Sequence, residues 1–120
     1  MIEFTPLENA ALLAIFGETP EFAEGLRCQL EVAIVGNRNN TGAGFYTDIV
    51  VPASAGRLEC PRILGQETHA RVDGLKYGLG FVLFMEDGRL HQLEGYCCGG
   101  EDTSDLPLSD LSFRIADTPF

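Results

Sequence analysis

The chain has 120 residues, a length typical of a single domain, and 45% of them are hydrophobic, which is enough for a buried core. Its 18 acidic residues outnumber its 8 basic residues, and the resulting net charge of -10 argues against nonspecific nucleic-acid binding, because such a surface repels phosphate. There is no basic leader and no apolar run of about 18 residues, so we expect a cytoplasmic protein that has no contact with a membrane.

The negative charge is concentrated at the two ends of the chain. Residues 1–26 hold five acids and no base, residues 94–120 hold six acids and one base, and the stretch between them is balanced. If the two ends fold side by side, they form one negative face suited to a basic partner. The alternative interpretation is that the net charge only keeps the protein soluble.

Two helices are expected at the start of the chain. Thr5, Pro6 and Glu8 have the pattern of a capping box with proline at the first helical position. Apolar residues follow at helical spacing as far as Gly17, where we expect the helix to end. Thr19, followed by another proline, marks the start of a second helix that we expect to last only about two turns.

The hydrophobic pattern changes to strand-like alternation after the second helix. Strands are expected at residues 28–35, 45–51, 68–73, 79–85, 89–96 and 108–115, with turns or loops at 36–42, 52–67 and 97–107. Helices that precede a meander of strands are typical of the α+β class. We therefore predict one domain over residues 1–120, with one or two N-terminal helices packed on a curved antiparallel sheet of five or six strands.

The cysteines and glycines indicate structure rather than chemistry. Cys28, Cys60, Cys97 and Cys98 contain no Cys-x-x-Cys pair, so we expect reduced thiols, no metal site and no cofactor. Two Gly-x-Gly segments, at 42–44 and 78–80, lack the lysine of a phosphate-binding loop. We interpret them as bare positions where another part of the chain packs closely.

A few polar residues in the predicted strands are candidates for a binding cleft. Tyr46 and Asp48 share one face of an otherwise apolar strand, and His69 and Arg71 share one face of another. The more common interpretation of each pair is that it lies on the solvent side of an antiparallel sheet. We expect His91, in the return strand of a hairpin, to be half-buried with apolar neighbours.

Three segments of the chain resemble those of small, acidic bacterial proteins of unassigned activity. They are residues 40–47 (NTGAGFYT), 80–84 (GFVLF) and 93–96 (LEGY). The resemblance covers about residues 30–100 and rests mainly on glycine and apolar positions. It implies an α+β fold in a bacterial cytoplasm and transfers no catalytic residue to this chain.

These observations favour a non-enzymatic acidic interaction module, such as an immunity protein or inhibitor that binds a basic protein. Glu101, Asp102 and Asp105 are the candidate binding carboxylates in the C-terminal stretch. The alternative is a small-molecule binding protein or enzyme with a cleft near Tyr46, Asp48, His69 and Arg71. A flat or convex acidic surface would favour the first hypothesis, and a concave pocket with convergent polar groups the second.

Overall fold

Two helices precede seven strands in the computed structural model, which describes residues 3–116. The helices are α1 (Pro6–Glu18) and α2 (Ala23–Val32). The strands are β1 (Ile34–Asn40), β2 (Gly44–Val50), β3 (Ile63–Leu64), β4 (His69–Val72), β5 (Leu79–Glu86), β6 (Arg89–Cys97) and β7 (Phe113–Ala116).

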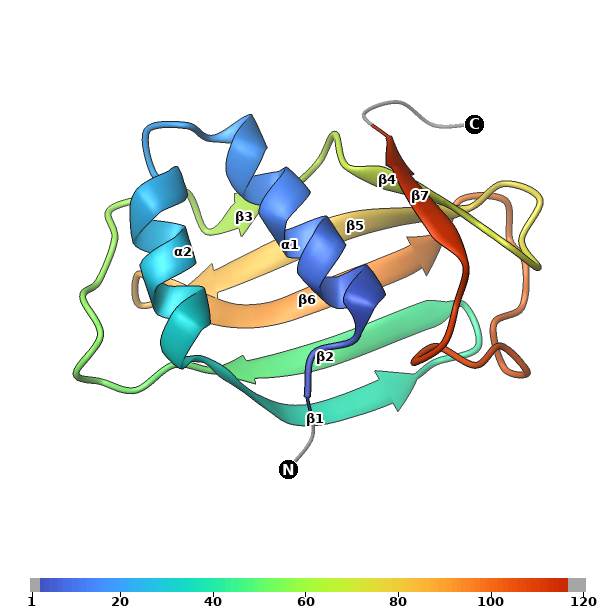
Figure 1. The fold of residues 1–120 in the computed structure, drawn as a ribbon, viewed down its shortest axis with the longest axis horizontal. Coiled ribbons are helices and arrows are strands. Elements are labelled where there is room, and N and C mark those ends of the chain that lie inside the picture. Colours follow the sequence, from blue (N-terminus) through green and yellow to red (C-terminus); the bar gives the residue numbers. More distant parts are fainter. Residues whose placement is uncertain (1–2, 117–120) are drawn as a thin grey trace.

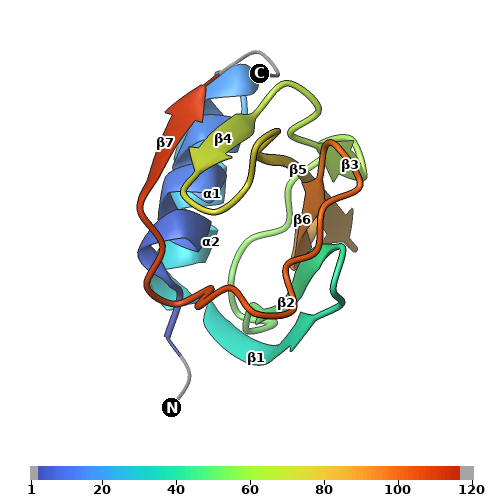
Figure 2. The same cartoon turned by 90° about the vertical axis from the view of Figure 1, so that its right-hand side faces the viewer.

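All the strands belong to one antiparallel sheet. Its order is β1-β2-β6-β5-β4-β7, and the short strand β3 pairs with β5 beside β4. The sheet curves around the two helices, and β7 crosses next to α1 (Figure 1, Figure 2). The predicted α+β class is therefore confirmed, with slightly more strands than the expected five or six.

Helix α1 begins where the capping box predicts. The Thr5 hydroxyl accepts a hydrogen bond from the Glu8 amide at 3.0 Å, and the Thr5 amide donates to the Glu8 carboxylate at 2.8 Å. The helix runs one residue past Gly17, where the Glu18 carboxylate accepts a hydrogen bond from the Thr68 hydroxyl. The end of α1 is thus bound by a side chain to the segment just before β4 rather than closed by a glycine.

The prediction of a strand from residue 28 is wrong, because α2 continues to Val32 and the strand begins only at Ile34. Thr19 is also not the N-cap of α2, since that position is held by Phe22. Leu26, Gln29 and Leu30 follow helical spacing and face the core. The apolar pattern of residues 30–35 fits the period of a helix as well as that of a strand. The packing of α2 against the core makes the residues up to Val32 helical.

Gln29 is the polar side chain that locks α2 onto the sheet. Its Nε2 donates to the carbonyl oxygens of Gly56 at 2.8 Å and Gly88 at 2.9 Å, and its Oε1 accepts from the Leu90 amide at 3.0 Å. Three hydrogen bonds satisfy a side chain that is only 2% exposed. A buried glutamine at this position therefore favours the helix over the predicted strand.

Two further predicted boundaries differ from the structure. Residues 37–40, expected in a turn, belong to β1, because the side chains of Arg38 and Asn40 find partners on other segments. The last strand begins at Phe113 rather than at residue 108, and the segment before it forms part of a long loop. In both places the decisive contacts join residues that are distant in sequence.

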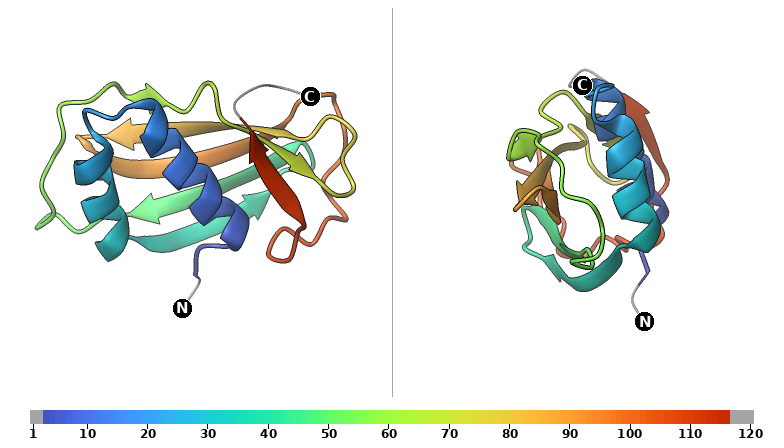
Figure 3. Two further views of the ribbon diagram at one scale, coloured as in Figure 1. Left: turned by 45° about the horizontal axis from the view of Figure 1, so that its top comes forward. Right: turned by 90° about the vertical axis from the view of Figure 1, so that its left-hand side faces the viewer.

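The core lies between the helices and the inner face of the sheet (Figure 3). On that face the rings of Phe45 and Phe81 pack edge to face, with centroids 6.4 Å apart. The buried hydrophobic residues are Leu7, Ala11, Leu12, Ile15, Phe16, Ala23, Leu26, Val35, Phe45, Ile49, Leu64, Ala70, Val72, Leu75, Leu79, Phe81, Leu83, Met85, Leu90 and Leu93.

Candidate functional site

The four residues of the predicted cleft all lie on the outer face of the sheet, away from the helices. Asp48 is opposite Gln92 and Tyr46 is opposite Glu94 on β6. On β4, Ala70 and Val72 point into the core, so His69 and Arg71 point outward. The outer face thus carries polar side chains on β2, β6 and β4, and the half-buried apolar side chains of Val82 and Phe84 on β5.

In the structure the four residues form two pairs, and the two pairs lie on different strands, far from each other. Tyr46 and Asp48 lie on β2, whereas His69 and Arg71 lie on β4, with β6 and β5 between them. Three strand spacings correspond to about 14 Å. Tyr46 and Asp48 instead interact with β6, where Gln92 donates to the Asp48 carboxylate at 2.9 Å. Four groups arranged in this way do not converge on one substrate atom.

Neighbouring groups on the outer face affect the pKa of Tyr46 and lie close to the buried His69. Hydrogen bonding to the Glu94 carboxylate raises the pKa of Tyr46. His69 is only 8% exposed, and its buried Nδ1 has no hydrogen-bond partner. The Tyr96 ring lies over Gly80, which is directly opposite His69, so a methyl group there would meet the Tyr96 hydroxyl at 2.4 Å.

His91 is not half-buried as predicted. Its side chain is 55% exposed, and its Nδ1 lies 3.1 Å from the Glu86 carboxylate. The register shifts between Phe84 and Met85, so His91 is the residue without a direct partner on β5. An irregularity of this kind in the β5–β6 hairpin is not visible in the alternation of the sequence.

The most acidic segment of the structure is residues 98–112, which we call the acidic loop. It connects β6 to β7 and contains four carboxylates, from Glu101, Asp102, Asp105 and Asp110, with no lysine or arginine. The loop occupies one end of the molecule's longest axis (Figure 1). Asp102, Asp105 and Asp110 are exposed there.

Thr103 fixes the acidic loop to the turn between β1 and β2. Its hydroxyl donates to Asn40 Oδ1 at 2.8 Å and accepts from the Gly44 amide at 3.0 Å, and the Thr103 side chain is fully buried. Its backbone amide and carbonyl are bonded to Gly42 and Asn40, at 2.7 and 2.8 Å. A buried residue thus holds the centre of an otherwise exposed loop.

Glu101 holds the acidic loop against the turn at residues 73–78. Its two carboxylate oxygens accept hydrogen bonds from the amides of Lys76 and Tyr77, both at 2.8 Å. These bonds lower the pKa of Glu101, and hydrogen bonds from Ser104 lower that of Asp102, so both carboxylates stay charged at neutral pH. Of the candidate carboxylates, Glu101 is therefore engaged in structure, and Asp102 and Asp105 face solvent.

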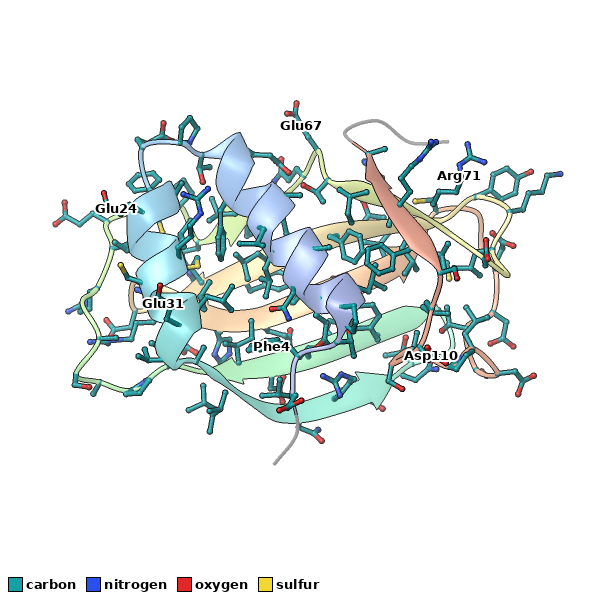
Figure 4. The ribbon with its side chains drawn as sticks, viewed as in Figure 1. Phe4, Glu24, Glu31, Glu67, Arg71 and Asp110 are labelled. Carbon is teal, nitrogen blue, oxygen red and sulfur yellow. The ribbon has the colours of Figure 1, made fainter. Side chains whose placement is uncertain are left out.

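The acids of the two chain ends do not form the single face considered from the sequence. Glu24 lies on α2 at one end of the long axis and Asp110 lies near the other (Figure 4), in a molecule 40 Å long. Glu8 is buried and paired with Arg38, so it contributes no surface charge. The described acids of the two chain ends are therefore divided between opposite ends of the molecule.

No disulfide joins the four cysteines in the structure. Burial raises the pKa of Cys60, Cys97 and Cys98, and in Cys97 the nearby charges of Glu101 and Asp102 raise it further. Within residues 3–116, no group of three or more His, Cys, Asp and Glu side chains has a metal-binding arrangement. No helix in this range has the length and apolar character needed to cross a membrane.

Sequence reasoning did not identify Thr103 or Tyr77 as parts of this end of the molecule. Thr103 carries no local signal, because its partners are about 60 residues away in the chain. Tyr77 is an aromatic residue between Lys76 and Gly78, in the short connection between the strands predicted at 68–73 and 79–85, and that setting indicates an exposed ring. Comparison with family models, curated proteins and solved structures found no match to this chain.

Proposed function

We propose that this protein is a non-enzymatic interaction module that binds a basic protein partner through the acidic loop, as an immunity protein or inhibitor would. The observation that carries this proposal is the attachment of the loop by the buried residue Thr103. The resemblance to small acidic bacterial proteins supports placing this activity in a bacterial cytoplasm.

Attachment matters because a flexible loop loses conformational entropy when it binds, which weakens the complex. Here Thr103 and Glu101 anchor the loop at two points, so the nearby Asp102 and Asp105 are held on a fixed backbone. A basic protein that meets this surface orders little of the chain. The fixed carboxylates also favour one orientation of the partner, which is what electrostatic complementarity contributes to specificity.

The outer face of the sheet is a weaker basis for an enzyme. Its polar groups are spread over β2, β6 and β4, and the Tyr46 and Asp48 pair is bonded to β6 rather than left open to a substrate. The acidic loop, in contrast, combines several exposed carboxylates of one sign on one segment. Long-range attraction to a basic surface then accelerates association at low ionic strength.

The proposal is tested with an oligoarginine peptide as the basic probe, by measuring its affinity at low and at physiological ionic strength. The variant D102N/D105N/D110N removes three charges from the acidic loop. The matched control E21Q/E24Q/E31Q removes three charges from exposed residues in and beside α2, at the other end of the molecule. We expect the loop variant to bind weakly with a flattened salt dependence, and the control to bind like the wild type.

Equal loss in the two variants would contradict the proposal, because it would show that only net charge matters. Binding by the wild type that does not respond to salt would contradict it as well. Circular dichroism of both variants checks that the fold is retained. An oligoglutamate peptide of equal length, which the acidic loop repels, is the negative control.

A further inference from the structure

We infer that the exposed ring of Tyr77 receives an arginine or lysine side chain of the basic partner, and that Lys76 competes for the same ring. This inference rests on the proposed function and adds the anchor residue of the interface. It draws on the contacts of the turn at residues 73–78, which the acidic loop encloses.

Tyr77 is held rigidly although it is exposed. The residue is 41% exposed, and its ring packs against Gly99, where a methyl group would meet Tyr77 Cδ2 at 2.1 Å. Its backbone amide is bonded to the Glu101 carboxylate at 2.8 Å. A rigid aromatic ring loses little side-chain entropy on binding, and such residues dominate the binding energy of interfaces.

The ring already binds a cation within the molecule. Lys76 Nζ lies 5.3 Å from the centroid of the Tyr77 ring, inside the range of about 6 Å for a cation–π interaction. The ammonium group of Lys76 therefore marks the position that a basic side chain of a partner would take. An arginine suits this position especially well, because its planar guanidinium stacks on an aromatic face.

The surroundings of Tyr77 favour a basic ligand over an apolar one. The Glu101 carboxylate lies beside the ring's backbone, and its lowered pKa keeps it charged at neutral pH. Among the exposed large hydrophobic side chains of residues 3–116, Tyr77 is the one aromatic; the others are Leu13, Val32, Ile34, Val50 and Ile63. Of these exposed hydrophobic residues, Tyr77 is therefore the one that offers an aromatic ring beside the acidic loop.

The test uses the oligoarginine probe with variants of the two residues. Tyr77→Leu removes the ring and should weaken binding about two- to five-fold, which is the range of an exposed cation–π contact. Tyr77→Phe keeps the ring and should bind like the wild type. Lys76→Met frees the ring and removes a repelling charge, so it should strengthen binding.

A double-mutant cycle separates the two effects of Lys76. If Lys76 competes for the ring, the gain from Lys76→Met is larger when Tyr77 is present than in the Tyr77→Leu background. An equal gain in both backgrounds would overturn the competition, because it would reflect net charge alone. The amide signals of residues 76 and 77, followed by nuclear magnetic resonance, confirm that the turn keeps its contact with Glu101.

Failure of the inference and failure of the proposed function give different results. If D102N/D105N/D110N loses binding while Tyr77→Leu binds like the wild type, Tyr77 is not the anchor and the acidic loop remains the binding surface. If D102N/D105N/D110N binds as tightly as the wild type, the proposed function itself is wrong.

Discussion

The guanidinium of Arg38 holds the carboxylate of Glu8 through two hydrogen bonds of 2.7 Å, one from Nε to Oε2 and one from Nη2 to Oε1. The Glu8 side chain is 1% exposed and that of Arg38 is 20% exposed. The same carboxylate accepts hydrogen bonds from the Thr5 amide and the Thr47 hydroxyl. One buried ion pair therefore joins the start of α1 to β1 and β2.

Replacing Arg38 with methionine should destabilise the protein strongly. The change leaves the Glu8 carboxylate buried without its counter-ion, and a buried pair broken in this way costs about 3–5 kcal/mol. Urea unfolding followed by circular dichroism measures the free energy of unfolding. The hydrogen bonds from Thr5 and Thr47 remain in this variant, so the loss reports on the missing charge.

The matched control removes both charges of the ion pair. The double variant Glu8→Gln with Arg38→Met should be less destabilised than the sum of its single variants, because no uncompensated carboxylate is left. Strict additivity, or a loss below about 1 kcal/mol for Arg38→Met, would show that the pair is effectively solvated. The pKa of Arg38 is raised chiefly by its hydrogen bond to Glu8, which agrees with a well-shielded pair.

The hydroxyl of Thr103 should be worth about 1–3 kcal/mol. Thr103→Val keeps the shape of the side chain but leaves the Gly44 amide without its acceptor in a buried site and removes the hydrogen bond from the hydroxyl to Asn40 Oδ1. Urea unfolding gives the change in stability, and limited proteolysis reports whether the acidic loop is released. We expect cleavage of the loop at protease concentrations that leave the wild type intact.

Thr103→Ser is the control, because it retains the hydroxyl and loses only a methyl group. It should protect the acidic loop nearly as well as threonine does. If Thr103→Val proves as stable and as protease-resistant as the wild type, the loop is held by other contacts, such as those of Glu101.

Local sequence patterns predict the parts of this fold whose determinants are local. The capping box at Thr5 and Glu8 places the start of α1, because both partners lie within one turn of helix. The alternation of β5 and β6 identifies their hairpin, apart from the shift near Phe84. Gly80 fits the expected close packing, since the Tyr96 ring covers it.

The remaining elements depend on polar side chains whose partners are distant in the chain. Gln29 reaches residues 27, 59 and 61 positions away, and without those partners its segment resembles a strand. From the sequence alone, Arg38 and Asn40 resemble turn residues. Their partners, Glu8 and Thr103, are distant in the chain and become neighbours only in the folded structure. The acidity of the loop is visible in the sequence, but its anchor is not.

The thiols of Cys60, Cys97 and Cys98 should react slowly with an alkylating reagent at neutral pH. Burial raises the pKa of Cys60, Cys97 and Cys98, and the thiolate is the reactive form, so the native protein keeps these groups mostly protonated. Iodoacetamide labelling followed by mass spectrometry should show slower reaction than in the unfolded chain, where all four cysteines react. A pair that stays unlabelled after denaturation without reductant would reveal a disulfide and contradict the assignment of free thiols.

The contact between Glu101 and the turn at residues 73–78 should be lost in acid. Hydrogen bonds from the Tyr77 and Lys76 amides lower the pKa of Glu101 below its ordinary value of 4.5. The carboxylate binds fewer protons in the folded state, so its contribution to stability is complete above pH 4.5 and is lost as the pH falls through the lowered pKa.

The amide signals of Lys76 and Tyr77 provide a direct measurement of this loss. Both should shift together as the pH is lowered, with a common midpoint below 4.5, and the Glu101→Gln variant should show no such transition. A midpoint at or above 4.5 would mean that the charged carboxylate gains nothing from the two amides. Oligoarginine binding, measured over the same range, should weaken as the acidic loop is neutralised and the ring of Tyr77 loses its fixed position.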